Sequence, residues 1–427
     1  MQPDPQLIPT PVPKSDPPSL RKPLRLALLR AAGIALRPPN PRTADGRPHV
    51  FRAAVRNPRG AAPATLQNSS PRILLIRPDH LGDMLFLTPA LRLLRAQLPA
   101  AHLTALVGPW AKSALARNPH LDDIQTLDFP GFTRSAKASP LAPYRYLWLA
   151  ARRLRAQRFD TAVVLRFDHW WGALLAALAG IPRRIGYDGP ELRPFINDVL
   201  RYEQGRHEVL QNVRLVSRAA RADEPALDSP ADLPLEFEPG PDAAAFAETW
   251  LRSKGIAPAE RFALLIPGSG ALVKLWREDG FARVAEALDA RGLKVISAGT
   301  GDAERALAQH IAAQSRAPLI NAVGETTFEQ LAALLERAAL VVGTDSGPMH
   351  LAVAMHTPSM HLFGPVSAQS FGPWGDQSRH IVLTSGLACI ACNRLDYDAA
   401  ELPAHPCVRL IADRQVLAAV EALCSVL

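Results

Sequence analysis

Residues able to bind an anion are concentrated between Val342 and Gly364, in the segment VGTDSGPMHLAVAMHTPSMHLFG. An apolar run typical of a strand ends there in residues 343–347, which favour turns and helix caps, and Pro348 suits the first turn of a helix. Strand, turn and helix in this order present free backbone N–H groups and the positive end of a helix dipole, where phosphates commonly bind. An ordinary capped loop is the alternative. The residues predicted to form this anion site are Thr344, Asp345, Ser346, Gly347 and His350.

A second polar group, residues 77–84 (RPDHLGDM), follows the first apolar run after residue 71. Gly82 lets the backbone approach a ligand closely, and Asp83 stands at the predicted start of a helix. A carboxylate in that place can act as a general base, although a helix cap alone would also explain it.

A third group, residues 267–276 (PGSGALVKLW), has the composition of a loop that holds a diphosphate. Ser269 and Gly270 can donate hydrogen bonds, and Lys274 can neutralise phosphate charge. The segment is neither a P-loop nor a GxGxxG fingerprint, since the residues that define each motif are missing.

Residues 299–304 (GTGDAE) form a fourth candidate, in which Asp302 or Glu304 could bind a ribose or a base edge. A carboxylate at this place in a loop also commonly caps the helix that follows, so this alternative stays open.

The chain has four cysteines, too few for a disulfide scaffold, and three of them follow one another closely near the C-terminus. Cys389, Cys392, His405 and Cys407 include the ligand types of a zinc site. Inert packing of the thiols is the preferred interpretation, and no metal is assigned.

These motifs fall in an alternating pattern of strands and helices. The strands expected in the first half are 72–76, 102–107, 124–127 and 161–165, and the helices are 84–97, 144–157, 170–179 and 209–222. The strands expected in the second half are 262–266, 294–297, 319–322, 341–342 and 360–363, with helices at 278–290, 303–314, 327–337 and 349–355.

This alternation predicts an α/β protein with two doubly wound, Rossmann-like domains that face each other across a cleft. The domains are expected at 71–222 and 242–427, joined by a proline-rich linker at 223–241. A last helix, 413–423, is expected to pack back on the first domain.

The net charge of +8 lies wholly in residues 1–70, which hold eleven Lys/Arg and three Asp/Glu. The remainder is neutral, so charge does not favour binding to nucleic acid. Residues 1–70 also hold fourteen prolines and are predicted to be a disordered leader. Within it, residues 24–36 have a leucine-rich face among basic residues, which suits either an anionic membrane surface or a short docking helix. The chain has no apolar run long enough to span a bilayer and no secretory signal, so a cytoplasmic location is predicted.

Taken together, segments 73–95, 267–276 and 342–366 resemble glycosyltransferase family 9, the ADP-heptose:lipopolysaccharide heptosyltransferases. The resemblance covers about residues 71–427. It implies a GT-B fold and an inverting, metal-independent transfer without a cofactor. It also implies a nucleotide-sugar donor, such as ADP-heptose, held mainly by the second domain, and a lipopolysaccharide or similar glycan acceptor. Peripheral contact with the cytoplasmic face of the inner membrane is a further expectation.

The family pattern assigns roles to residues of this chain. It makes Asp83 the base that deprotonates the acceptor hydroxyl, and it places Lys274 and Ser269 at the diphosphate. Glu304, or Asp302 beside it, stands where the family has a carboxylate for the nucleoside. The residues assigned to the acceptor side are His80, Gly82 and His207, the last within a segment (206–209, with Asn212) that resembles one near the acceptor.

Two other functions remain open on the sequence. A nucleotide-sugar epimerase of similar architecture would act on the donor alone, and a non-catalytic nucleotide-sugar-binding protein would need no base. The presence of both Asp83 and Lys274 argues against the second.

Overall fold

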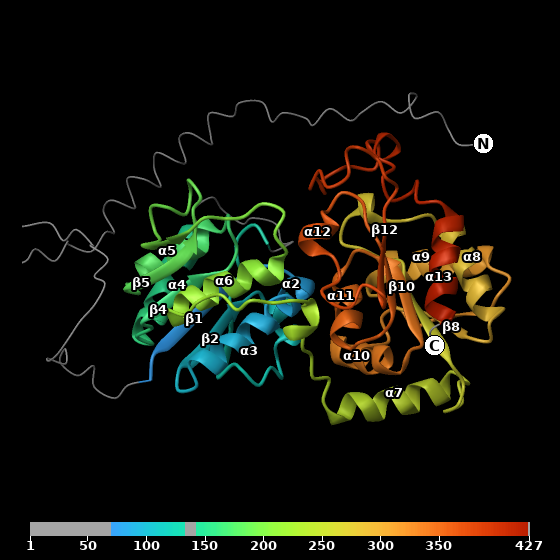
Figure 1. Ribbon diagram of the computed structural model, residues 1–427, viewed down its shortest axis with the longest axis horizontal. Coiled ribbons are helices and arrows are strands. Elements are labelled where there is room, and N and C mark those ends of the chain that lie inside the picture. The colour runs from blue at the N-terminus through green and yellow to red at the C-terminus, as the bar shows by residue number, and fades with distance from the viewer. Residues whose placement is uncertain (1–69, 133–141, 426–427) are drawn as a thin grey trace, which may run out of the picture.

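The computed structural model describes residues 70–132 and 142–425, which form two α/β lobes side by side (Figure 1). All but the last residue of the predicted leader, including segment 24–36, lies outside the described residues. Each lobe is built on a six-stranded parallel sheet. The prediction of two doubly wound, Rossmann-like domains of GT-B type is therefore confirmed.

The first sheet has the order β3-β2-β1-β4-β5-β6, so the chain winds outward from β1 in both directions. Its central strand, RILLIR, is apolar and buried on both faces, as expected where helices cover both sides of a parallel sheet. The strands are β1 (Arg72–Arg77), β2 (His102–Val107), β3 (Asp123–Thr126), β4 (Thr161–Val164), β5 (Arg183–Tyr187) and β6 (Asp198–Leu200).

The second sheet repeats this pattern in the order β12-β11-β10-β7-β8-β9. Strand β10 pairs with β7 and with β11, so the loops that follow β7 and β10 leave the sheet next to each other. The strands are β7 (Phe262–Ile266), β8 (Lys294–Ser297), β9 (Leu319–Asn321), β10 (Leu340–Thr344), β11 (Ser359–Leu362) and β12 (His380–Leu383).

The single helix predicted at 84–97 is wrong, because the structure has two helices there. They are α2 (Leu81–Leu85) and α3 (Thr88–Gln97). Pro89 lies in the first turn of α3 and has no N–H to continue α2, while the Thr88 hydroxyl donates to the carbonyl of Leu85. The break lets the short helix α2 point toward the second lobe. The other helices of the first lobe are η2 (Pro109–Ala114), α4 (Ala142–Ala156), α5 (Trp170–Leu178) and α6 (Glu208–Ala220).

Segment 223–241 runs from α6 to α7 (Pro241–Ser253), which lies beneath α10 (Phe328–Arg337) of the second lobe (Figure 1). The final helix, α13 (Asp413–Ser425), packs on α8 (Glu278–Asp289), β11 and β12. The prediction that this helix returns to the first lobe is wrong, because its apolar face (Val416, Val420, Leu423) completes the core of the second. The remaining helices are η3 (Pro230–Asp232), η4 (Leu272–Lys274), α9 (Gly301–Gln314), α11 (Gly347–Ala354), α12 (Ala368–Phe371) and η5 (Leu402–Ala404).

The two lobes share one continuous apolar cluster. It joins α2, α3 and β1 of the first lobe to α10, α11 and Trp374 of the second. The closest interlobe packing pairs α2 with α11, and both lie between the sheets in Figure 1. Since α2 follows β1 and α11 follows β10, the carboxyl ends of the two central strands point toward a common region.

No helix within residues 70–132 and 142–425 combines the length and the apolar character that a membrane span requires.

Several buried histidines should make the fold sensitive to acid. Burial lowers the pKa of His169, His207 and His380 to about 4. The unfolded chain therefore binds protons first, and stability should fall as the pH drops from about 6.5 toward 4, by about 2 kcal/mol for each histidine at pH 5.

His169 offers a direct test, because neither ring nitrogen has a hydrogen-bond partner among the described residues and the ring packs among Phe129, Phe132 and Trp171. His169→Phe should lessen the loss of thermal stability between pH 7 and pH 5. The same measurement on His310→Gln, at an exposed site, should show the wild-type loss. An unchanged pH dependence in His169→Phe would contradict the assignment.

Candidate active site

A cleft of about 3040 Å³ opens between the two lobes. Loops that follow strands of both sheets line it, including 79–83 from the first lobe and 268–271 and 345–348 from the second. All four motif groups singled out from the sequence contribute to this one cleft, although the first, residues 77–84, lies far along the chain from the other three. Their common position makes the cleft the candidate active site.

On the second lobe, the carboxylate of Asp345 contacts the side chains of both Lys274 and His350. Lys274 Nζ donates to Asp345 Oδ2 at 2.7 Å, and His350 Nε2 lies 3.5 Å from Asp345 Oδ1. Asp345 is only 5% exposed, and burial alone would raise its pKa. The hydrogen bond from His350 and the charge of Lys274 outweigh burial and lower the pKa to about 2, so Asp345 is ionised at neutral pH. Its ion pair holds Lys274 in place, and both residues line the cleft.

The start of α11 offers hydrogen-bond donors to an anion. Ser346 is the N-cap residue, but its hydroxyl makes no cap bond and has no hydrogen-bond partner among the described residues. The hydroxyl therefore remains available beside the unpaired N–H groups of the helix start. Two neighbouring hydroxyls hold the adjoining loops together, since Ser269 donates to the carbonyl of Asp345 and Thr344 to that of Gly268.

Glu304 lies against the backbone of the loops that follow β7 and β8. A Cβ atom at Gly268 or Gly299 would approach the Glu304 carboxylate to 2.3–2.4 Å, so a larger residue at either place would displace the carboxylate. Glu304 Oε2 accepts a hydrogen bond from the N–H of Thr300, which shows that the capping role considered from the sequence is real. Asp302 is exposed, and both carboxylates line the cleft. Gly270 lies in the adjoining part of the wall.

On the first lobe, Asp83 lies in the cleft beside a buried arginine. Arg77 Nη2 lies 3.4 Å from Asp83 Oδ1, and the N–H of His80 donates to Asp83 Oδ2 at 3.2 Å. Burial and the charge of Asp79 raise the pKa of Asp83 above its usual range, against the opposing charge of Arg77. A carboxylate with a raised pKa is a stronger base, which suits general base catalysis.

Arg77 is held by residues that come from far along the chain. Its guanidinium donates to Glu208 at 2.7 Å and to Asn212 at 2.6 Å, both on α6. Glu208 and Asn212 belong to the segment predicted to lie near the acceptor side, and neither lines the cleft itself. Both are buried, and they position Arg77 behind Asp83.

The predicted acceptor-side histidines separate in the structure. His80 is exposed and lines the cleft. His207 is not among the cleft residues, because both of its nitrogens are engaged elsewhere. Nδ1 accepts from the N–H of Val209 at the start of α6, and Nε2 donates across the lobes to the carbonyl of Gly372 at 3.1 Å. His207 thus acts as a helix cap and an interlobe contact, which corrects its assignment to the acceptor side.

Gly82 marks the point where the lobes touch. A Cβ atom there would lie 2.8 Å from Cδ2 of His350 and 3.3 Å from Cα of Gly347. His350 cannot easily move, since its ring also packs on Phe86 at 4.5 Å and approaches Asp345. This contact places Asp83, the residue after Gly82, close to the start of α11.

Gly82→Ala should therefore push the lobes apart, with a loss of stability of about 1–3 kcal/mol from overpacking and a loss of activity. The control is His350→Ala, which removes the ring that a methyl group would strike. In the double variant, the loss of stability on unfolding should be smaller than the sum of the two single losses. Additive losses would contradict the contact.

Sequence reasoning did not identify the aromatic and cationic wall of the first lobe. The rings of Phe167 and Tyr202 lie 4.6 Å apart at 32°, and both line the cleft near Arg166. Arg166 forms ion pairs with Asp79 and Asp168. The run Arg166-Phe167-Asp168-His169 directly after β4 was the available signal, since ligand-binding residues gather at such strand ends.

Cys389, Cys392 and Cys407 are not among the residues that line the cleft, although Ala391 and Asn393 on either side of Cys392 are. Cys389 is partly buried, Cys392 exposed and Cys407 buried, and all three are free thiols. Across the part of the chain that the structure describes, no three His, Cys, Asp or Glu side chains gather in a way that could hold a metal ion.

Comparisons with known proteins agree with this geometry. The chain is 27% identical to lipopolysaccharide heptosyltransferase 2 of Escherichia coli K12 over 334 residues. This match covers 74% of this chain and 89% of the relative. Among solved structures, a family 9 glycosyl transferase from Veillonella parvula superposes with a TM-score of 0.67 at 24% identity, over 83% of this chain and 97% of the other. The E. coli protein described as ADP-heptose lps heptosyltransferase II superposes with a TM-score of 0.63 at 23% identity, over 82% and 98%.

The sequence model of the family described as "Glycosyltransferase family 9 (heptosyltransferase)" matches residues 147–395, more than half of the chain. The matched region contains the donor-side groups Lys274, Glu304 and Asp345 to His350, while the segment around Asp83 lies before it. With two parallel sheets and a cleft between the lobes that carry them, this chain belongs to glycosyltransferase family 9 and is a glycosyltransferase.

Proposed function

We propose that the protein transfers a heptose from ADP-heptose to a lipopolysaccharide core or similar surface glycan, with inversion at the sugar carbon and without a metal ion. One observation carries the proposal. The contact between Gly82 and Gly347 brings a carboxylate with a raised pKa, Asp83, next to a helix start with a free hydroxyl, Ser346. The names of the E. coli relatives support heptose, ADP and lipopolysaccharide as the reactants.

In the proposed reaction, Asp83 takes the proton of an acceptor hydroxyl as its oxygen attacks the anomeric carbon of the donor sugar. The bond from that carbon to the diphosphate breaks on the opposite face, which inverts the configuration. Lys274, the backbone N–H of Ser269, the hydroxyl of Ser346 and the dipole of α11 stabilise the charge that develops on the departing ADP. Asp345 holds Lys274 in place, and Glu304 or Asp302 lies where the nucleoside would bind.

The two substrates would occupy different walls. The donor would lie on the loops after β7, β8 and β10, whereas the acceptor would lie against His80, Gly82 and the Phe167–Tyr202 wall. Aromatic rings suit the apolar faces of sugars. Because a lipopolysaccharide is lipid-anchored, the proposed place of reaction is the cytoplasmic face of the inner membrane.

A thermal-shift panel of ADP-, GDP- and UDP-sugars, followed by product analysis with candidate acceptors, tests the proposal. ADP-heptose should raise the unfolding temperature most, and ADP should be released only when an acceptor is present. An isomerised sugar formed from donor alone would instead identify an epimerase. Donor binding with no turnover on any acceptor would identify a non-catalytic binding protein.

A further inference from the structure

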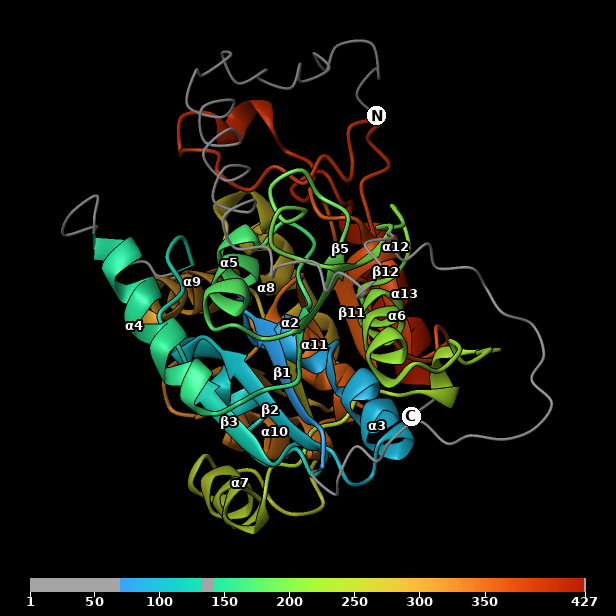
Figure 2. The ribbon, with the colours of Figure 1, turned by 90° about the vertical axis from the view of Figure 1, so that its left-hand side faces the viewer.

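Helix α4 carries an unusual outer face. Its inner residues, Leu147, Ala150, Ala151 and Leu154, are buried against the first lobe. On the opposite side, Trp148 is 53% and Leu149 42% exposed, and both are among the most exposed large apolar side chains of the described residues. In Figure 2, α4 runs along the outer edge of this lobe. Large apolar side chains paired in this way on a helix surface commonly mark an interaction site.

Arginines surround this apolar pair. With 100° per residue, Arg145 and Arg152 project on the same side as Trp148 and Leu149, while Arg153 and Arg155 flank that side. The helix sequence APYRYLWLAARRLRA contains no acidic residue. None of the four arginines forms an ion pair with an acidic side chain among the described residues. The guanidinium of Arg152 lies over the Trp148 ring at 4.7 Å, so charge and aromatic surface are presented together.

We infer that the outer face of α4, formed by Arg145, Trp148, Leu149, Arg152 and Arg153, docks on an anionic lipid bilayer. An interfacial helix uses a tryptophan and a leucine to enter the headgroup boundary, and arginines around them to bind anionic lipids. The outer face of α4 has both, and its arginines have no acidic partner among the described residues. The charge does not fit the leader of the same chain, since residues 1–70 carry a net +8 and would be repelled. It fits a second copy no better, because two such faces would bring like charges together.

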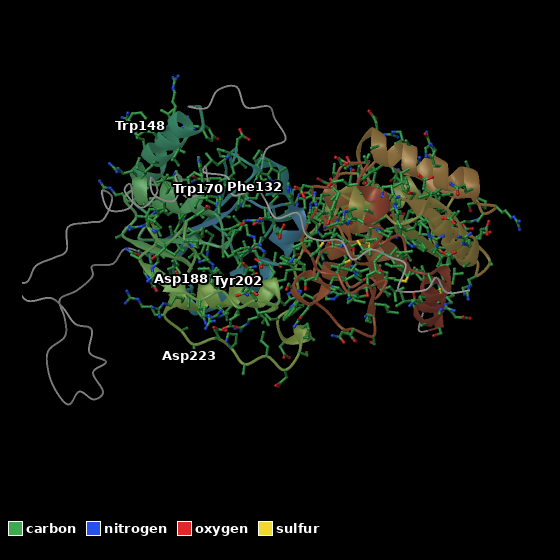
Figure 3. All side chains as sticks on the ribbon, turned by 90° about the horizontal axis from the view of Figure 1, so that it is seen from above. Phe132, Trp148, Trp170, Asp188, Tyr202 and Asp223 are labelled. Atoms are coloured by element: carbon green, nitrogen blue, oxygen red, sulfur yellow. The ribbon has the colours of Figure 1, made fainter. Side chains whose placement is uncertain are left out.

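An aromatic row connects this face to the cleft. Tyr146 of α4 stacks on Trp171, Trp171 stacks on His169, and His169 meets Phe132, which lines the cleft. In Figure 3, Trp148 lies at the outer part of the first lobe and Phe132 nearer the second lobe. A bilayer on α4 would therefore lie on the side of the first lobe where this aromatic row begins, and the row ends at the cleft. A benefit to an acceptor held in the same bilayer rests on the proposed function, whereas lipid binding itself does not.

The test is sedimentation of the full chain with phosphatidylcholine vesicles, with and without phosphatidylglycerol. The wild-type protein should bind only the anionic vesicles. Trp148→Ala should weaken binding about tenfold, and Arg145→Gln and Arg152→Gln about fivefold each. Two matched controls on the second lobe, Leu410→Ala (40% exposed) and Arg252→Gln, should bind like the wild type.

Two results would overturn the inference. The first is that the α4 variants bind vesicles as the wild type does, while removal of residues 1–60 abolishes binding. This result would assign vesicle binding to residues 1–60 and not to α4. The other is a wild-type dimer that Trp148→Ala converts to a monomer without any effect on vesicle binding, which would make α4 a contact between copies.

Activity separates this inference from the proposed function. The α4 variants should transfer sugar normally to a delipidated acceptor but slowly to an acceptor held in vesicles. If the wild type binds anionic vesicles through α4 yet transfers no heptose, the proposed function fails while the lipid surface stands.

Discussion

Asp83→Asn should lower the rate of sugar transfer by about 10²–10⁴-fold, because the amide cannot accept the proton of the acceptor hydroxyl. The change keeps the size of the side chain and its hydrogen bond from the N–H of His80, so α2 should still form. Donor binding should persist, since the donor loops belong to the second lobe. The measurements are kcat with saturating donor and acceptor, and the thermal shift caused by ADP-sugar.

A matched control is Asp188→Asn, which changes another carboxylate that lines the cleft on the first lobe. Asp188 is about half exposed and forms a surface ion pair with Arg193, so its loss should leave kcat close to that of the wild type. Wild-type turnover in Asp83→Asn, or an equal loss in both variants, would rule out Asp83 as the base.

The pH dependence of kcat/KM should carry a second signature of Asp83. The base must be ionised in the free enzyme, so activity falls as the pH drops through its pKa. Because burial and the charge of Asp79 raise that pKa, the acid limb should lie above the usual range of a carboxyl group. Asp79→Asn removes a negative neighbour and should move the limb to lower pH. A limb that stays in place, with the protein folded, would assign it to a different group.

The strands were predicted from continuous apolar runs, and this criterion failed for strands that lack such a run. Strands such as RILLI and FALLI are buried on both faces and were recognised directly. Strands β5, β6 and β12 were missed, since RRIGY, DVL and HIVL are short and each contains a charged residue or a histidine, so none is a long apolar run. Their charged residues are paired in three dimensions, as when Arg183 binds Asp198. Such pairs lie in neighbouring strands, and a local pattern does not reveal them.

In the candidate site too, motifs of consecutive residues were predicted, whereas contacts between distant residues were not. Motifs formed by consecutive residues, such as Asp345-Ser346-Gly347, were found because turn and cap chemistry is local. The support of Asp83 was not found, because Arg77 is held by Glu208 and Asn212, 131 and 135 residues away. His207 was assigned to the acceptor for a related reason. Its bond to Gly372 spans 165 residues and depends on how the lobes meet.

Lys274→Met should lower kcat by about 10²–10³-fold, the range seen when one charge-stabilising donor is removed. Lys274 is the cation that the structure places beside the start of α11, where the leaving diphosphate is proposed to lie. Methionine keeps most of the length and apolar stem while removing the charge. The control is Lys254→Met, which breaks a surface ion pair with Glu325 on the same lobe and should leave kcat unchanged.

Stability should change as well, and this effect could be mistaken for a catalytic one. Without Lys274, the buried carboxylate of Asp345 loses its main counter-charge, so its pKa should rise and the protein should unfold more readily at neutral pH. Asp345→Asn in the same chain removes the uncompensated charge and should restore part of that stability. If Lys274 only neutralises Asp345, this double variant regains activity together with stability. If Lys274 stabilises the departing diphosphate, the double variant is stable and remains slow, and this second outcome is the one expected.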